Sequence, residues 1–195
     1  GVSGINGVPW DAVELPSQFM ENFCWEKEAL DLFAKDFETG DTINKDLFKK
    51  MTKARSFHAA IQMVRQLEFA IFDFRLHLEF ASKNKHNIQK LLDDVRENVS
   101  VVKTPEFNRF QHSFSHIFAG GYSAGYYSYK WAEVLSADAF SKFEEQGIFN
   151  KLTGNEFLKS ILEKGGSCEP MDMFIEFRGR KPSIEPLLKH AGIAV

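Results

Sequence analysis

The sequence predicts an all-α fold, and three observations support this prediction. No stretch of the 195 residues alternates apolar and polar side chains over more than four residues, as a half-buried strand would. Residues 57–80 contain neither glycine nor proline, and their apolar side chains recur at spacings of three and four, as on a long helix. Helix-ending signals also recur, among them Pro105 and the glycine pair at 165–166.

Residues 1–195 are expected to form a single domain, because 44% of them are hydrophobic and the length allows one substantial core. The net charge of -3 comes without a basic block, which disfavours nucleic acid and anionic membrane surfaces as partners. No apolar run approaches the roughly 18 residues of a membrane span, and no signal peptide is recognisable, so we expect a cytoplasmic protein. Cys24 and Cys168 form neither a disulfide framework nor a metal motif, and we expect two free thiols.

The N-terminal part is predicted to alternate loops and helices. Residues 1–10 contain three glycines and should form a loop. A long helix is expected next, capped by Asp11 and reaching about Phe37. After a turn, Thr42 or Asn44 should cap a short helix. The twenty phenylalanines of the chain predict extensive aromatic packing between such helices.

A long buried helix is expected over residues 57–80. Its apolar positions should face the core, namely Ile61, Val64, Leu67, Ile71 and Phe74. His58 and His77 lack the spacing that would bring two imidazoles to one metal ion, so we expect them to pack or to face solvent. After a polar linker, residues 88–102 repeat the amphipathic pattern before Pro105.

The C-terminal part is predicted to hold four more helices, separated by glycines and prolines. They should span approximately Gly121–Glu145, Asn155–Gly165, 169–180 and 184–193. Residues 107–118 are rich in aromatic and polar side chains and support no assignment.

Tyrosines and glycines are concentrated at the start of the first of these helices. If the segment after Gly121 is helical, Tyr122, Tyr126 and Tyr129 stand at i, i+4 and i+7 and share one face. Neutral phenols donate hydrogen bonds at pH 7, so this face, with His116 nearby, suits holding a backbone or a developing oxyanion. The alternative is that these are core aromatics with satisfied hydroxyls. The opposite face should pack through Tyr127, Trp131, Val134 and Leu135.

A second candidate position lies near the N-terminus. Glu14, Gln18 and Glu21 share a face of the expected helix at i, i+4 and i+7. Two carboxylates on one face can form a metal or acid/base site, but from spacing alone a solvated face is the favoured interpretation.

Three segments resemble one family: GVSGINGVPWDAVELPSQFMENFCWE, FSHIFAGGYSAGYYSYKWAEVLSADAF and GGSCEPMDMFIEFRGRKP. They resemble the thimet oligopeptidase-like zinc metallopeptidases, and among them the oligopeptidase A type. The resemblance extends over essentially the whole chain. It implies the helical C-terminal portion of a zincin-type catalytic domain, in an enzyme that cleaves short peptides with zinc-activated water.

The resemblance also implies roles for individual residues. In the family, zinc is held by the two histidines of HExxH and by a downstream glutamate, which matches Glu14 here. Tyr129, helped by His116 or Tyr126, would hydrogen-bond the oxyanion of the tetrahedral intermediate. Tyr122 would help to hold the peptide backbone. The substrate-binding loop would include Gly120 and Gly121, whose backbone freedom allows it to move as substrate enters.

The 195 residues contain no HExxH motif. We therefore expect the chain to be the C-terminal part of the peptidase, and we expect it to be inactive and to bind zinc weakly on its own. One alternative is a dipeptidyl carboxypeptidase, which shares the zinc chemistry but releases dipeptides from the C-terminus. Another is a non-catalytic helical interaction module.

Overall fold

The computed structural model describes residues 7–80 and 87–193, in which the regular elements are helices. Within them there is no β-strand, only an isolated bridge between Lys35 and Thr42. The all-α prediction is confirmed. No helix in the described part is long and apolar enough to cross a lipid bilayer.

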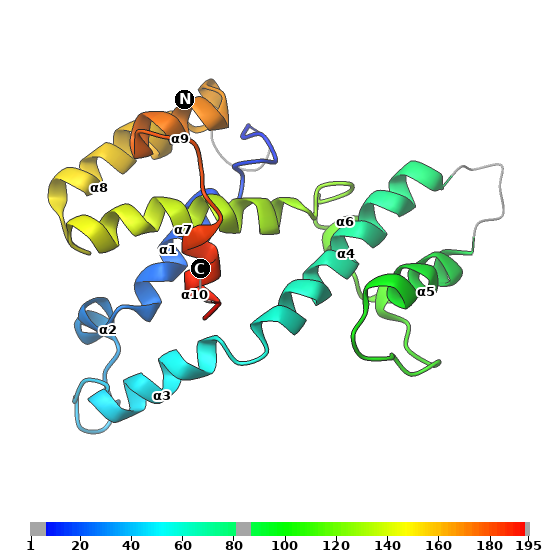
Figure 1. Ribbon diagram of the computed structural model, residues 1–195, viewed down its shortest axis with the longest axis horizontal. Coiled ribbons are helices and arrows are strands. Elements are labelled where there is room, and N and C mark those ends of the chain that lie inside the picture. Colours follow the sequence, from blue (N-terminus) through cyan, green and yellow to red (C-terminus); the bar gives the residue numbers. More distant parts are fainter. Residues whose placement is uncertain (1–6, 81–86, 194–195) are drawn as a thin grey trace. The chain divides into compact units, whose positions relative to one another are not determined.

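The chain divides into two compact units, which Figure 1 shows as ribbons. The first unit comprises Gly1–Phe57 and Lys130–Val195, and the second comprises His58–Tyr129. The expectation of one domain over residues 1–195 stays a prediction.

Helix α7 (Ser128–Gln146) runs through the core of the first unit. Its buried side chains Leu135, Phe140 and Phe143 contact helices from both ends of the chain. The other helical segments of this unit are α1 (Leu15–Asn22), η1 (Phe23–Trp25), α2 (Lys27–Phe33), α3 (Lys45–Arg55), α8 (Lys151–Phe157), the π-helical turn η3 (Leu158–Leu162), η4 (Gly165–Ser167), α9 (Pro170–Arg178) and α10 (Glu185–His190).

The core of the first unit is aromatic, as the phenylalanine content predicted. Phe19 stacks on Phe157 with ring centroids 3.9 Å apart, and it meets Phe23 and Phe140 edge-on at 5.7 and 5.9 Å. Edge-to-face and offset-stacked aromatic pairs stabilise a fold by more than the burial of their apolar surface alone. These contacts join α1 to α7 and α8.

The helix expected from Asp11 to Phe37 is wrong in its limits. Glu14, not Asp11, precedes α1 as its N-cap residue, and the helix ends at Asn22. The Asn22 amide donates to the carbonyl oxygens of Gln18 and Phe19 and to the Ser136 hydroxyl. Such side-chain bonds to the backbone compete with helix propagation. Glu26 then adopts an extended conformation before α2 begins.

In the second unit, α4 (Ala59–Glu79) packs on α5 (Ile88–Val99), followed by η2 (Phe110–His112) and α6 (Ser115–Phe118). The buried face predicted for α4 is wrong at three of its five positions, whereas Ile71 does pack against the core. Ile61, Leu67 and Phe74 are 38, 41 and 46% exposed, whereas Glu68 and Asp73 are fully buried. Both carboxylates have partners inside: Glu68 pairs with Arg65 and Arg96, and Asp73 accepts backbone N–H groups.

The two cysteines and the start of α8 were also predicted from the sequence. Cys24 and Cys168 are free and exposed, as expected. The helix expected from about Asn155 begins earlier, at Lys151, because the Asn150 side chain accepts the N–H groups of Leu152 and Thr153.

Candidate functional site

Four aromatic side chains predicted to act together lie together in the second unit. We call His116, Tyr122, Tyr126 and Tyr129 the tyrosine cluster. The His116 ring centroid lies 6.2, 5.7 and 6.1 Å from those of Tyr122, Tyr126 and Tyr129. Tyr129 stacks on Tyr122 at 5.0 Å and lies 5.1 Å from Tyr126. One imidazole therefore contacts three phenol rings.

A tight reversal at Gly120 and Gly121 brings these rings together. After α6, the Ser115 carbonyl accepts the N–H groups of both Ala119 and Gly120, and the Tyr122 N–H donates to the His116 carbonyl at 3.0 Å. A Cβ atom on Gly120 would lie 2.9 Å from the Cα and carbonyl oxygen of His116. Gly121 has φ = +83°, in the left-handed region. The sequence thus needs glycine at both positions to return Tyr122 to His116.

The helical phase predicted for the three tyrosines is wrong, although the residues do meet. Helix α7 begins at Ser128, and residues 123–127 form turns. Ala124 has φ = +55°, which no right-handed helix contains. Tyr122 and Tyr126 therefore reach Tyr129 from a folded loop. Of the predicted packing face, Leu135 is buried and Tyr127 stacks on Phe74, but Trp131 is 50% exposed.

The phenols of the tyrosine cluster differ in environment. Tyr126 is buried, and its hydroxyl donates to Oε1 of Gln66 at 3.0 Å. Burial, and secondarily the neighbouring Tyr129, raise the pKa of the Tyr126 phenol. Tyr122 is also buried, whereas Tyr129 is half-buried and His116 is exposed. Solvent therefore reaches the cluster from the side of His116 and Tyr129.

Chemically, the exposed side of the cluster combines hydrogen-bond donors with an apolar backing. Phenols and imidazole can donate to carbonyl oxygens or to an oxyanion. The partly buried ring of Phe69 and the buried ring of Phe114 pack against Tyr126, with centroids 5.8 and 5.0 Å away. Such a supported set of neutral donors suits binding a polar backbone.

Glu14, the predicted zinc ligand, belongs to the first unit. It is half-buried at the start of α1, where its Oε2 accepts the Ser17 hydroxyl at 2.8 Å. Gln18 and Glu21 follow on the same helix, and Glu21 is exposed. Among residues 7–80 and 87–193, no group of three or more His, Cys, Asp or Glu side chains could hold a metal ion. The residues present fit one ligand of a zinc site rather than a complete site.

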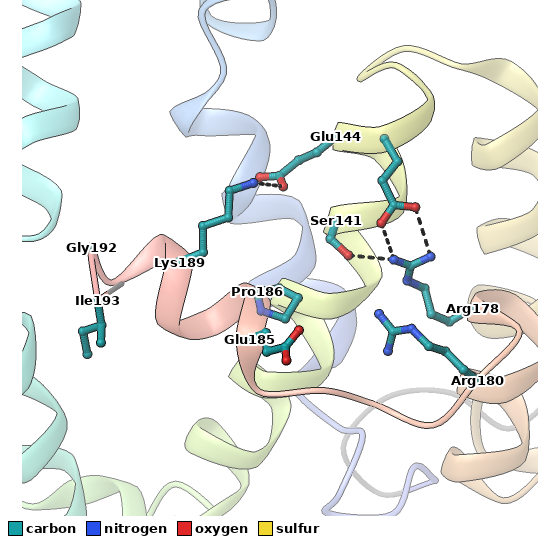
Figure 2. A pocket seen from close by; sticks show the side chains of 10 residues that line it. Ser141, Glu144, Arg178, Arg180, Glu185, Pro186, Lys189, Gly192 and Ile193 are labelled. Carbon is teal, nitrogen blue, oxygen red and sulfur yellow. Dashed lines mark hydrogen bonds and ion pairs between the residues drawn. The ribbon is translucent and has the colours of Figure 1, made fainter. Parts of the chain in front are cut away.

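A pocket of about 950 Å³ lies elsewhere in the first unit, among α7, α9 and α10 (Figure 2). Several of its charged side chains form ion pairs within the pocket. Arg178 donates to Ser141 and Glu145, and Lys189 donates to Glu144. Three acidic and three basic side chains line the pocket, so their formal charges balance and favour neither an anionic nor a cationic ligand.

Arg180, which lines this pocket, donates both guanidinium N–H₂ groups to the fully buried Asp138 at 2.6 Å. Burial alone would raise the pKa of Asp138, but the hydrogen bonds from Arg180 and from the Ser183 N–H hold it below its ordinary value. This ion pair ties α7 to the segment after α9.

Sequence reasoning missed two residues that contact the tyrosine cluster. Gln66 accepts the Tyr126 hydroxyl, and Asp73 accepts backbone N–H groups of the loop. The available signal was Asp73 itself, a carboxylate inside the apolar run AIFDF. Nothing in the sequence distinguishes Gln66 from a solvated side chain.

Comparisons with known proteins place these residues in a family. The family model for peptidase family M3 matches residues 1–193. The chain is 58% identical over 193 residues to oligopeptidase A of Escherichia coli, covering 99% of this chain and 28% of that protein. It is 50% identical to the organellar oligopeptidase A of Arabidopsis thaliana, covering 98% of this chain and 25% of the relative.

A further relative is the dipeptidyl carboxypeptidase of Escherichia coli, 32% identical over all of this chain and 28% of the relative. The chain thus spans about a quarter of the length of the curated relatives it matches. Because the family model matches nearly every residue, the chain belongs to peptidase family M3.

Proposed function

We propose that this chain is the C-terminal part of a zinc-dependent oligopeptidase and supplies the groups that bind the peptide and its oxyanion. The tyrosine cluster is the single observation that carries this proposal. It brings four donor-bearing rings to one partly exposed place, next to a glycine reversal. The similarity to oligopeptidases supports short peptides as substrates.

The environments within the cluster suggest a division of roles. Tyr129 is half-buried beside the exposed His116, so we assign to this pair the hydrogen bonds to the oxyanion. The Tyr126 hydroxyl donates its hydrogen bond to Gln66, which favours a supporting role in which its oxygen accepts a hydrogen bond or its ring orients Tyr129. Tyr122, with the backbone at Gly120 and Gly121, would hold the substrate chain.

Glu14 is the residue of this chain that would bind zinc. A carboxylate oxygen is a suitable zinc ligand, but two more protein ligands are needed and the 195 residues contain no HExxH. When bound, the metal would supply activated water. We propose that Glu14 is one ligand in the complete enzyme, and that the chain by itself binds zinc weakly and lacks peptidase activity.

The test compares two glutamates of one helix in the complete enzyme. Glu14→Gln should lower zinc affinity by more than about tenfold, because a neutral amide replaces a charged ligand. Glu21→Gln is the matched control, since Glu21 is exposed on the same helix, and it should change the affinity less. Competition with a chromogenic chelator measures both. Equal loss from the two variants would show that Glu14 is not the ligand.

The second candidate function is a dipeptidyl carboxypeptidase, favoured by the 32% identity to that enzyme. Peptides blocked at the C-terminus separate the two functions, because an oligopeptidase cleaves them internally whereas a dipeptidyl carboxypeptidase needs a free C-terminus. A non-catalytic helical module is the third possibility. The coding sequence upstream of Gly1 distinguishes this module from an enzyme, because the enzyme requires an HExxH motif there.

A further inference from the structure

Asp73 is a fully buried carboxylate in the second unit, and its partners come mainly from the loop that carries the tyrosines. Its Oδ1 accepts the N–H of Ala124 at 2.9 Å, and its Oδ2 accepts the N–H of Tyr126 at 3.0 Å. The Nδ1 atom of His77 lies 2.9 Å from the same Oδ1. A buried carboxylate is tolerated only with such donors.

The two bonds to Asp73 satisfy backbone N–H groups of the loop that precedes α7. Ala124 and Tyr126 precede α7, so their N–H groups have no place in its hydrogen-bond ladder. Ala124 has φ = +55°, a conformation that a Cβ atom makes unfavourable. The carboxylate binds on both sides of Gly125 and thus fixes the turn at its strained residue.

The same segment determines where two rings of the tyrosine cluster lie. The Tyr126 ring is 5.1 Å from Tyr129 and 5.7 Å from His116. The Gly125 N–H donates to the Tyr122 carbonyl at 2.8 Å, so the turn also fixes Tyr122. Release of the backbone at Ala124 and Tyr126 would therefore move the phenols relative to His116.

We infer that Asp73 is a positioning residue for peptide hydrolysis: through two backbone N–H groups it holds the loop that aims the tyrosine cluster. This inference rests on the proposed function. Asp73 does not need to touch the substrate. Asparagine cannot replace it, because the amide has one acceptor oxygen and would turn an N–H₂ group toward one of the backbone donors.

The test uses Asp73→Asn in the complete, zinc-loaded enzyme. Misplacing reacting groups by about 1 Å lowers turnover by roughly 100-fold, so kcat for an internally quenched peptide should fall by roughly 10- to 100-fold. KM should change less, because most of the binding surface remains. Amide hydrogen exchange within residues 122–127 should accelerate at least about tenfold, since two hydrogen bonds of that segment are weakened.

The matched control is Asp138→Asn. Asp138 is also fully buried and also accepts a backbone N–H, that of Ser183, but it lies in the first unit and has no bond to the loop. The Asp138→Asn variant should have a lower Tm, a kcat within about twofold of wild type and unchanged amide hydrogen exchange in residues 122–127. Equal losses of kcat from both variants, or unchanged exchange in 122–127 on Asp73→Asn, would overturn the inference.

The wild-type enzyme supplies a measurement that depends on neither variant folding. The amides of Ala124 and Tyr126 should exchange at least about tenfold more slowly than unstructured amides although both lie outside helices. If these two amides exchange as fast as unstructured ones, Asp73 does not anchor the loop. If the wild type shows protection but cleaves no peptide, the proposed function fails and with it the inferred role in hydrolysis, while the anchoring of the loop stands.

Discussion

Gly120 occupies a position where the backbone leaves no room for a side chain. An added Cβ would lie 2.9 Å from two backbone atoms of His116, which cannot rotate away as a flexible side chain does. Gly120→Ala should therefore shift the reversal, destabilise the second unit by about 1–3 kcal/mol and separate His116 from Tyr122. Urea unfolding and peptide turnover of the complete enzyme measure the two effects.

Gly154→Ala is the contrasting variant for this prediction. Gly154 lies within α8, and a Cβ there would meet no atom within 4 Å. Alanine in a helix interior is favoured over glycine by about 0.5–1 kcal/mol, so this variant should be stabilised. Similar destabilisation from both substitutions would contradict the steric explanation for Gly120.

At this scale the sequence predicted the members of the site better than their arrangement. The tyrosines and His116 do meet, because aromatic rings flanking a glycine pair are brought together by the reversal. The helical path predicted between them was wrong: Ala124 has a positive φ, and its N–H and that of Tyr126 donate to Asp73, which is 51 positions before Ala124. The sequence pattern around Ala124 cannot predict a hydrogen bond to a residue so far away in the chain.

Among the elements, α3 depends most on its cap. None of its residues is buried, so packing contributes little, and the Asn44 side chain accepts the Leu47 N–H at 2.9 Å. Asn44→Ala should cost about 1 kcal/mol locally and speed amide exchange across Lys45–Arg55 roughly fivefold. Exchange detected by mass spectrometry measures this.

Asn87→Ala provides the comparison, because Asn87 caps α5 in the same way. Helix α5 also buries Leu92 and Val95 in the core, so its exchange should change less beyond the first turn. Equal acceleration in both helices would show that burial does not hold α5.

The elements also show where helix prediction succeeds and where it fails. The starts of the capped, amphipathic helices were predicted correctly: Asn44, one of the two candidate caps, caps α3, and α5 begins at Ile88. Helix α4 was predicted with the wrong face, because Glu68 and Asp73 are buried with partners from elsewhere in the chain. A prediction that places every charged residue on the exposed face assigns the wrong buried face to a helix whose buried side carries paired carboxylates.

At the scale of the whole molecule, Glu144 ties α10 to α7 in a pH-dependent way. Its Oε1 lies 3.0 Å from Nε2 of His190, and its Oε2 accepts from Lys189. The hydrogen bond with His190 is the largest cause that lowers the pKa of Glu144, from 4.5 to about 2. The folded pKa lies below the unfolded one, so this stabilisation is present above about pH 4.5 and is lost as the pH falls toward 2.

Urea unfolding at pH 6 and pH 3 tests this contribution. The wild-type chain should lose about 1–2 kcal/mol more than Glu144→Gln over this range, because glutamine does not titrate and the carboxylate is only partly exposed. Parallel losses in the two proteins would show that Glu144 does not contribute to acid sensitivity.

We propose that the tyrosine cluster acts on the substrate of an M3 peptidase, with Tyr129 as the oxyanion donor. Tyr129→Phe in the complete, zinc-loaded enzyme keeps the ring and removes one hydroxyl. A donor used mainly in the transition state affects kcat rather than KM. We expect kcat to fall roughly 10²- to 10³-fold, equivalent to about 3–4 kcal/mol.

Tyr127→Phe is the matched control, because Tyr127 stacks on Phe74 with centroids 5.2 Å apart and lies outside the tyrosine cluster. We expect near wild-type kcat for Tyr127→Phe beside the large loss for Tyr129→Phe. Equal loss of kcat from both variants in correctly folded enzyme, or a change confined to KM on Tyr129→Phe, would show that Tyr129 is not the oxyanion donor.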